Sequence, residues 1–353
     1  MGDNEQNNQL HFQLETEPSI SHGWYKPAFE FLSSDHCSGR HFFNPIKRPN
    51  TVNKSELFKW LLTRKSKTWT VDADKERHEL FPETRPLPIN RPDADLDDWQ
   101  IWFIGHATVL IQIGPYNFLT DPVWCKVASP FKHRGPERVI PAGIALEELP
   151  HIDAVLLSHN HYDHMDLASL AWLHEHFAMP IYTGLGNANY LPKNYNVTEL
   201  DWWQDAEFEG IEIIYTPAQH GSGRGLRDQN QALWGGFSLR MKEGHFFFAG
   251  DTGYSPHFKE IKQRLGAPRV ALLPIGAYEP RRILQYLHMN PHDALQAHQD
   301  LHAQCSVAIH YRTFQLTDEA RDLPEQELHD AIMHSSKLIS PFYCIREGRK
   351  LIV

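Results

Sequence analysis

The sequence predicts an α/β fold with mixed sheets, and three observations support that prediction. From Trp99 onward, short apolar runs are separated by Gly, Pro, Asn and Asp, which is the composition of strands joined by turns. Stretches with helical periodicity lie between those runs, as they do where strands and helices alternate. No repeat of fixed period is visible, which argues against a solenoid or a propeller.

The composition favours a globular protein and excludes several other classes. Of the 353 residues, 41% are hydrophobic and 22% are charged, so the chain as a whole is not disordered. The 34 basic and 44 acidic residues give a net charge of −10, a balance that argues against a nucleic-acid partner. The four cysteines stand far apart, which excludes a disulfide scaffold and a cysteine-rich zinc site and suits a reducing compartment.

Targeting segments are not recognisable in the sequence. The first ten residues are polar and acidic, unlike a secretory signal. No apolar run approaches the ~20 residues that span a bilayer. We therefore expect a cytoplasmic protein that can still attach peripherally to the inner face of a membrane.

The predicted elements divide the chain into three parts. Residues 1–43 lack periodicity and are rich in polar side chains, so we expect a partly disordered tail. Residues 44–98 form an extension rich in Pro and charge, with a helical pattern over Ser55–Lys67. Residues 99–353 form the main domain. Its expected strands are Ile101–Ile104, Val109–Ile113, Phe118–Leu119 (after a turn at Gly114–Asn117), Ala154–Leu157, Ile211–Tyr215, His245–Ala249, Val270–Leu273 and Val307–Ile309, and its expected helices are Leu167–Phe177, His257–Leu265 and Pro291–His302.

The densest group of metal-binding side chains directly follows the predicted strand Ala154–Leu157. It contains three imidazoles and one carboxylate within six residues: His159, His161, Asp163 and His164. A loop leaving a strand can direct such side chains at one point, whereas a helix would align only two of them. Imidazole nitrogen and carboxylate oxygen both suit zinc. We therefore favour a metal site over a solvated loop that happens to be rich in histidine.

Three further residues occupy equivalent places in the sequence. His220, Asp251 and His310 each follow a predicted strand closely. The carboxyl ends of strands in an open α/β sheet gather at one edge, where ligands bind. Each of these residues alone is weak evidence for a metal site. Together with the four residues of the loop they supply seven ligands, enough for two metal ions that share a bridging ligand.

These motifs resemble the metallo-β-lactamase superfamily and, within it, the N-acylphosphatidylethanolamine-hydrolysing phospholipase D family. The resemblance runs from about Asn44 to Phe314. It is densest in six blocks: Ile104–Val109, Leu119–Pro122, Ile152–Asp166, Glu199–Trp203, Phe246–Tyr254 and Pro274–Arg281. The combination of SHNHYDH, ELDWW, FFFAGDTGY and PIGAYEPR is much more restrictive than the superfamily motif alone.

The resemblance implies a four-layer αβ/βα sandwich, with residues 99–353 as its hydrolase domain, and two zinc ions at one edge of the sheets. By this resemblance, His159, His161 and His220 hold one zinc, Asp163, His164 and His310 hold the other, and Asp251 bridges them. The resemblance further implies that a hydroxide between the metals would hydrolyse N-acylphosphatidylethanolamine to N-acylethanolamine and phosphatidic acid. In that case we expect Asp163 and Asp251 to orient this hydroxide and His288 to lie near the substrate phosphate. The family also leads us to expect a homodimer.

Two segments beside the expected site depart from the pattern of the relatives. After His310 the chain reads Tyr311-Arg312, and after His220 it reads Gly221-Ser222-Gly223-Arg224-Gly225, which is smaller and expected to be more flexible. These departures leave the head-group and acyl-chain preference open.

Two other functions remain compatible with the sequence. One is a different hydrolase of the same fold that acts on small phosphodiesters or lactones, because the ligands do not distinguish these bonds. The other is a metal-binding or lipid-binding protein without activity, which the complete ligand set disfavours.

A phospholipid substrate would bring this acidic chain to a membrane surface. Basic clusters that can face anionic lipid occur at Lys47–Arg48, Arg64–Lys67, Lys132–Arg134 and Arg281–Arg282. The helical pattern over Glu56–Leu62 places bulky apolar residues beside the second cluster, as in an interfacial anchor. The alternative is a helix docked on the core of the protein itself.

Overall fold

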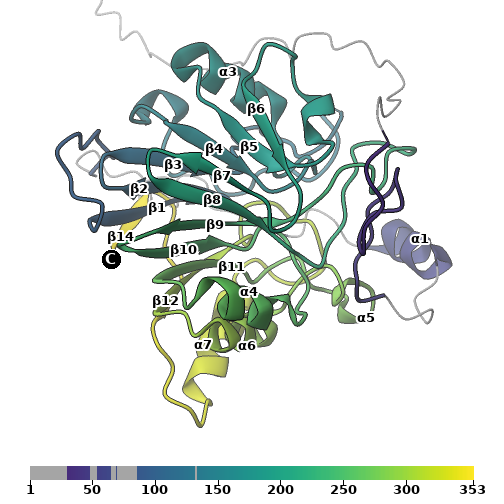
Figure 1. Cartoon of the computed structure of the whole chain (residues 1–353). Helices are drawn as coiled ribbons and strands as arrows, with labels where there is room; N and C mark the ends of the chain where they lie inside the picture. The colour runs from purple at the N-terminus through teal and green to yellow at the C-terminus, as the bar shows by residue number, and fades with distance from the viewer. Residues whose placement is uncertain (1–29, 48–53, 65–68, 70–85, 132) are drawn as a thin grey trace, which may run out of the picture.

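Two mixed β-sheets lie face to face with helices on their outer sides (Figure 1). The computed structural model describes residues 30–47, 54–64, 69, 86–131 and 133–353. Each sheet has seven strands: on one side of the sheet three neighbouring pairings are antiparallel, and on the other side three are parallel. The order of layers is therefore helix, sheet, sheet, helix, as expected for the αβ/βα sandwich.

The strands of the first sheet come from the first half of the main domain and from the end of the chain. In spatial order they are β14 (Arg349–Ile352), β1 (Trp99–Gly105), β2 (Thr108–Ile113), β3 (Tyr116–Thr120), β4 (Ala154–Leu157), β5 (Ile181–Gly184) and β6 (Val197–Leu200). The second sheet is built in the same way from β13 (Phe342–Tyr343), β12 (Cys305–Ile309), β11 (Val270–Pro274), β10 (Gly244–Phe248), β9 (Gly236–Met241), β8 (Ile211–Thr216) and β7 (Asp205–Phe208).

The helices cover the outer faces of the two sheets. Figure 1 shows α3 (Leu167–Phe177) over the first sheet, and α4 (His257–Leu265), α6 (Pro291–Leu301) and α7 (Leu323–Met333) over the second. The short helix α5 (Arg281–Leu284) and α1 (Lys54–Thr63) lie together at one side of the sandwich. Two 3-10 turns complete the described elements, at Leu146–Glu148 and Asn187–Tyr190. None of the helices in the described ranges could cross a bilayer, since none combines the necessary length with an apolar sequence.

Apolar side chains fill the spaces between the layers. Between the sheets, residues such as Ile101, Ile111 and Phe118 join one continuous core with Ile213 and Phe246. A second core lies under α3, where Leu170 and Leu173 pack against the outer face of the first sheet. The central parallel strands β4, β11 and β12 are buried along their whole length, which explains why they read as unbroken apolar runs in the sequence.

The predicted elements are present, with differences at their ends. All eight expected strands form, and α3 and α4 have the predicted bounds. The turn before β3 is shorter than predicted, because Tyr116 and Asn117 already pair with β2. The helix predicted over Ser55–Lys67 begins at Lys54 and ends at Thr63, and residues 65–67 lie outside the described residues. Six strands were not predicted, β5, β6, β7, β9, β13 and β14, because they are short and several of them are polar.

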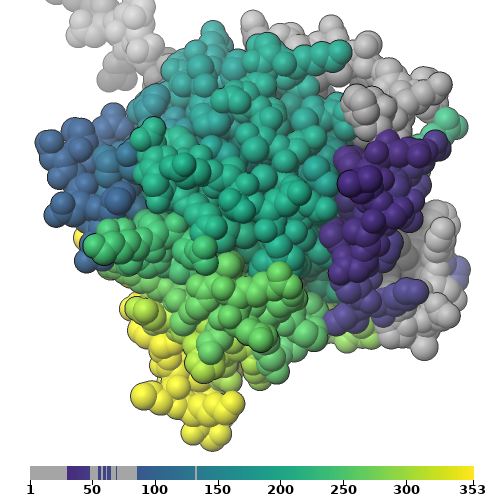
Figure 2. Space-filling view, in the orientation of Figure 1, coloured from purple at the N-terminus to yellow at the C-terminus, as the bar shows by residue number. Residues whose placement is uncertain are grey.

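Residues 30–47 lie along the surface of the sandwich (purple in Figure 2), although the tail was predicted to be partly disordered up to residue 43. Phe42 is 1% exposed and belongs to the main core. The ring of His36 stacks on Trp202 with 4.3 Å between ring centroids. Its two nitrogens each lie 2.7 Å from a carboxylate oxygen, one of Asp35 and one of Asp201. This segment, which we call the N-terminal strap (residues 30–47), thus makes apolar contacts through Phe42 and His36 and a charged contact between His36 and Asp201.

The charged contact makes the attachment of the strap depend on pH. Although burial lowers the pKa of His36, Asp201 and Asp35 raise it above the ordinary value of 6.5. Burial also raises the pKa of the Asp201 carboxyl group, but the contact with His36 outweighs this effect and keeps that pKa below its ordinary value of 3.8. The stabilisation from His36 is complete below pH 6.5 and is lost as the pH rises through its raised pKa. Asp35 is 88% exposed on its side chain, so Asp201 is the main partner.

We therefore predict that amide protection in the strap decreases from mildly acidic to alkaline pH, and that His36→Gln abolishes most of this decrease. The Phe42 amide donates to the Asn230 carbonyl at 2.8 Å. Its hydrogen-exchange rate, corrected for the intrinsic exchange rate at each pH, measures this protection. The same pH dependence in the native chain and in His36→Gln would show that the His36 contact does not control the attachment.

Candidate metal centre

The seven side chains predicted to bind metal converge at one edge of the sandwich. Four of them, His159, His161, Asp163 and His164, lie in the loop directly after β4. The other three follow β8, β10 and β12, which all belong to the second sheet: His220, Asp251 and His310. The edge where both sheets end therefore gathers ligands from four strands, as the sequence predicted.

The first group of candidate ligands consists of three histidines. Nε2 of His159 lies 2.8 Å from Nδ1 of His161, and Nε2 of His220 lies 3.2 Å from the same atom. Ligand atoms of these three residues lie within 4.8 Å of one another. One metal ion in contact with all three nitrogens would fit this spacing.

The second group surrounds Asp163 and Asp251. Oδ2 of Asp163 lies 3.5 Å from Nε2 of His164 and 3.4 Å from Nε2 of His310. Oδ2 of Asp251 lies 3.2 Å and 3.1 Å from the same two nitrogens, and 3.6 Å from Nε2 of His220. Asp251 thus stands between the two groups, which is the place of a bridging ligand.

The charges of this cluster favour bound cations. Burial raises the pKa of Asp251, but His310 and His164 hold it well below its ordinary value, so this buried carboxylate stays ionised. Burial lowers the pKa of His310, but Asp251 and Asp163 raise it to about 9. Among the described residues, Nε2 of His164, Nε2 of His310 and Oδ1 of Asp251 are buried without a hydrogen-bond partner. Buried polar atoms without partners are costly, and a metal ion would satisfy all three.

Hydrogen bonds behind the ligands fix the orientation of their rings. Nδ1 of His164 donates to Oδ2 of Asp121 at 2.6 Å, and Nδ1 of His220 donates to the Leu287 carbonyl at 2.9 Å. Nδ1 of His159 lies 2.9 Å from Oγ of Ser158, which in turn donates to Asp121 at 2.6 Å. Each of these bonds leaves Nε2 of the ring facing the centre, where a metal would bind.

Two buried polar residues of the site were not predicted as site residues. Asp121 is 0% exposed and supports His164 and Ser158. His106 is 1% exposed, and its Nε2 lies 3.1 Å from Oδ2 of Asp163. Both directly follow a strand, β3 and β1 respectively, so the rule that located Asp251 and His310 could also have located them.

His288, predicted to lie near the substrate phosphate, is at the rim of the cluster. Its Nδ1 lies 3.8 Å from Oδ2 of Asp251, and its side chain is 14% exposed. Its ring centroid lies 5.0 Å from that of His220 and 5.5 Å from that of His310. It therefore borders the candidate ligands and is still reachable from outside.

The loop after His220 is firmly bound, although its small residues predicted flexibility. Arg224 donates from Nη1 to the carbonyls of Asn160 and Met165 at 2.9 and 2.8 Å. Its guanidinium lies over the ring of Tyr162, 3.9 Å from the ring centroid. The arginine fastens this loop to the histidine-rich loop, and so stabilises the site from outside.

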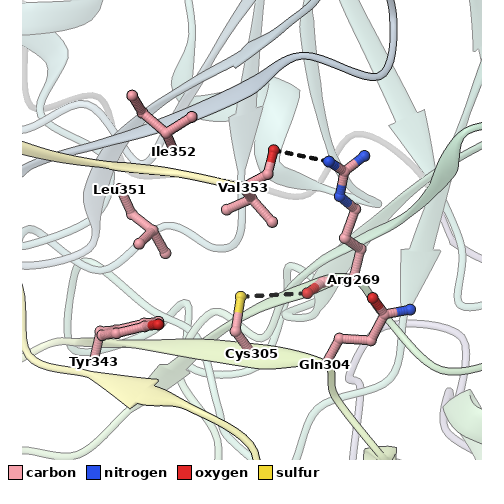
Figure 3. Close-up of a pocket in the computed structure, with 7 residues that line it drawn as sticks. All are labelled: Arg269, Gln304, Cys305, Tyr343, Leu351, Ile352 and Val353. Atoms are coloured by element: carbon pink, nitrogen blue, oxygen red, sulfur yellow. Dashed lines mark hydrogen bonds between the residues drawn. The ribbon is translucent and has the colours of Figure 1, made fainter.

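A hollow lies at the other end of β12, away from the metal cluster, and Figure 3 shows its lining residues: Arg269, Gln304, Cys305, Tyr343, Leu351, Ile352 and Val353. Arg269 already donates to the main-chain oxygen of Val353 at 2.7 Å and pairs with Asp97. Burial raises the pKa of the Cys305 thiol to about 11, so this thiol is protonated at neutral pH. Of the described residues that line it, therefore, none offers a nucleophile or an unpaired charge for catalysis.

Comparison with known proteins agrees with this geometry. Residues 116–311 match a family model described as a beta-lactamase superfamily domain. The chain is 37% identical over 301 residues to N-acyl-phosphatidylethanolamine-hydrolyzing phospholipase D 1 of Caenorhabditis elegans, covering 78% of this chain and 82% of that protein. It is 36% identical over 221 residues to the mitochondrial N-acyl-phosphatidylethanolamine-hydrolyzing phospholipase D of Saccharomyces cerevisiae, covering 60% of this chain and 47% of that protein. A metallo hydrolase from the archaeon Ignicoccus hospitalis shares the fold, with a TM-score of 0.55 and 20% identity over 72% of this chain and 98% of that chain.

The site depends on a close backbone contact at Gly250, next to Asp251. This glycine has φ +60°, and an added Cβ would lie 2.6 Å from the Gly235 carbonyl oxygen and 2.9 Å from Cβ of Ser158. We predict that Gly250→Ala lowers the free energy of unfolding by about 2–4 kcal/mol, because the strain of the left-handed conformation adds to overpacking. Thermal unfolding and metal content measure the effect, and both should fall.

Gly210→Ala is the matched control. Gly210 has φ +81°, but an added Cβ would meet nothing within 4 Å. In this variant only the strain of the left-handed backbone conformation should lower the free energy of unfolding, by about 1 kcal/mol, and the metal content should not change. Equal losses in the two variants would show that the contact at Gly250 does not constrain the site.

Proposed function

Because the chain belongs to the β-lactamase superfamily, and within it to the family of the N-acyl-phosphatidylethanolamine-hydrolyzing phospholipases D, we propose that it is a zinc-dependent phosphodiesterase of the phospholipase D type. Its substrate would be N-acylphosphatidylethanolamine, cleaved to N-acylethanolamine and phosphatidic acid. The observation that carries this proposal is the seven-residue cluster with Asp251 at its centre, in a chain 37% identical to a relative of that name.

The cofactor in this proposal is two zinc ions. His159, His161 and His220 would hold one ion, Asp163, His164 and His310 would hold the other, and Asp251 would contact both. Two such ions would supply hydroxide at neutral pH and stabilise negative charge on the phosphate. The donor set is imidazole and carboxylate without thiolate, which suits zinc but also other divalent transition metals.

The protein residues have three tasks in the reaction. The carboxylates of Asp163 and Asp251, both ionised, would orient the attacking hydroxide and relay its proton towards the leaving oxygen. The bonds behind the histidine rings keep each Nε2 directed inward, so that little reorganisation is needed during the reaction. His288, at the rim, would contact a phosphate oxygen and place the phosphorus in line with the attack. As the hydroxide oxygen forms its bond to phosphorus, the P–O bond to the N-acylethanolamine would break, and the leaving oxygen would receive the proton, which leaves phosphatidic acid.

We predict that Asp251→Asn reduces phospholipid hydrolysis by a factor of about 10³ or more, because losing several kcal/mol of charge stabilisation slows the reaction by that order. Mass spectrometry of N-acylphosphatidylethanolamine in mixed micelles measures both products, and elemental analysis measures zinc. Asp205→Asn on the exposed strand β7 is the control and should retain full activity. Appreciable activity in Asp251→Asn would overturn the two-metal assignment. A native chain with two zinc ions but no cleavage would direct the search to small phosphodiesters and lactones.

We further propose that the protein works at a membrane surface from the cytoplasmic side. All four cysteines are free thiols, as suits a reducing compartment. Trp60 of α1 donates to Asp318 at 2.6 Å, so this side chain is bound to the protein rather than directed at lipid. Leu62 of α1 and Leu226 of the loop after His220, however, are 69% and 101% exposed. We propose that these two leucines enter the lipid interface, since exposed apolar side chains gain from burial there.

The double variant Leu62→Asp with Leu226→Asp should float at least about tenfold less with vesicles of anionic phospholipid, because each leucine contributes roughly 1.5–3 kcal/mol on burial. Leu338→Asp is the matched control: this leucine is 102% exposed, but it lies between α7 and β13, far from α1 (Figure 1). If flotation decreased equally in the double variant and in Leu338→Asp, or decreased in neither of them, Leu62 and Leu226 would be excluded as the membrane anchor.

A further inference from the structure

The N-terminal strap, which precedes the matched family domain, reaches the backbone of a candidate metal ligand. Asn44 lies in this strap. Its Nδ2 donates to the carbonyl oxygen of His220 at 2.7 Å, and its Oδ1 accepts from the amide of His220 at 3.1 Å. One side-chain amide therefore pairs with both polar backbone groups of the same histidine. The same Oδ1 also accepts from the indole nitrogen of the buried Trp234 at 3.2 Å.

His220 needs such support more than the other ligands of the second sheet. It lies four residues beyond the end of β8, whereas Asp251 lies three residues beyond the end of β10 and His310 directly follows β12. Its ring is fixed by the bond to the Leu287 carbonyl at 2.9 Å, but this bond sets only the direction of the ring. The position of its Cα depends on the backbone, and zinc sites tolerate deviations of only about 0.2 Å in ligand distance.

The strap itself is held in place on both sides of Asn44. Before it, Phe42 is buried in the core and its amide donates to the Asn230 carbonyl at 2.8 Å. After it, Nε2 of Gln219, the neighbour of His220, donates to the Ile46 carbonyl at 2.9 Å. These contacts make Asn44 a fixed point to which the loop can be attached.

We propose that Asn44 is a positioning residue that sets the metal affinity of the group formed by His159, His161 and His220. It acts through the backbone of His220 and touches neither metal nor substrate. The strap is thereby part of the metal centre, although it lies before residues 116–311 of the matched domain. This inference rests on the metal centre of the proposed function, but not on the identity of the substrate.

The test measures metal binding in the full chain without any substrate. Asn44→Ala should weaken zinc binding at one of the two sites by about 10–100-fold, the usual effect of losing a partner that orients a ligand. Competition with a chromophoric chelator gives the affinities, and the visible spectrum of the Co²⁺-loaded protein reports the coordination of that site. A variant with a merely structural defect would lose stability without a change in this spectrum.

Asn90→Ala is the matched control. Oδ1 of Asn90 also accepts from the backbone amide of a histidine, His151, at 3.1 Å, but His151 is not part of the metal cluster. This variant should bind zinc like the native chain. Asn44→Asp is the second variant in case Asn44→Ala does not fold: it keeps the acceptor for the His220 amide but replaces the donor to the His220 carbonyl by a second acceptor, and should also weaken zinc binding.

The outcomes separate this inference from the proposed function. Two zinc ions bound equally tightly by the native chain and by the Asn44 variants would overturn the role of Asn44 and leave the proposed function intact. Zinc binding weakened in the Asn44 variants but not in Asn90→Ala would support it, even if N-acylphosphatidylethanolamine is not the substrate. A native chain that binds no zinc would overturn both.

Discussion

The whole arrangement depends on keeping two buried carboxylates ionised next to a group of imidazoles. Asp163 and Asp251 are 14% and 2% exposed on their side chains, and a buried charge without a partner is very costly. Protons on His164 and His310 balance these charges in the bare protein, and metal ions would do so more completely. The balance holds only if every ring keeps its position. The remaining features of this edge, from the ring-orienting bonds to the close backbone contacts, serve that requirement.

The sandwich meets this requirement by placing its ligands close behind the ends of buried strands. Asp251 and His310 follow strands that are buried along most of their length and therefore move little. The histidine-rich loop is longer, and it is held from behind by Asp121 and from outside by Arg224. His220 is the ligand whose supports are spread most widely along the chain. They come from Leu287 and from the N-terminal strap.

Much of this could be predicted from the sequence, for a physical reason. Strands buried on both faces, such as β4 and β11, appear as unbroken apolar runs, and polar residues at their ends mark the sheet edge. Edge strands such as β7, with the sequence DAEF, bury little and give no such pattern. Contacts between distant segments are also invisible to local patterns. Asn44 contacts a residue 176 positions away and follows no predicted strand, so only the folded chain reveals its role.

The position of β14 has a consequence for the folding of the nascent chain. This last strand, Arg349–Ile352, pairs with β1, the apolar strand Trp99–Gly105 at the other end of the main domain. A nascent chain that already contains all seven candidate ligands would still present the free edge of β1, which is a template for pairing with other chains. Until β14 has left the ribosome, the protein can thus have its complete set of candidate ligands and remain prone to aggregation.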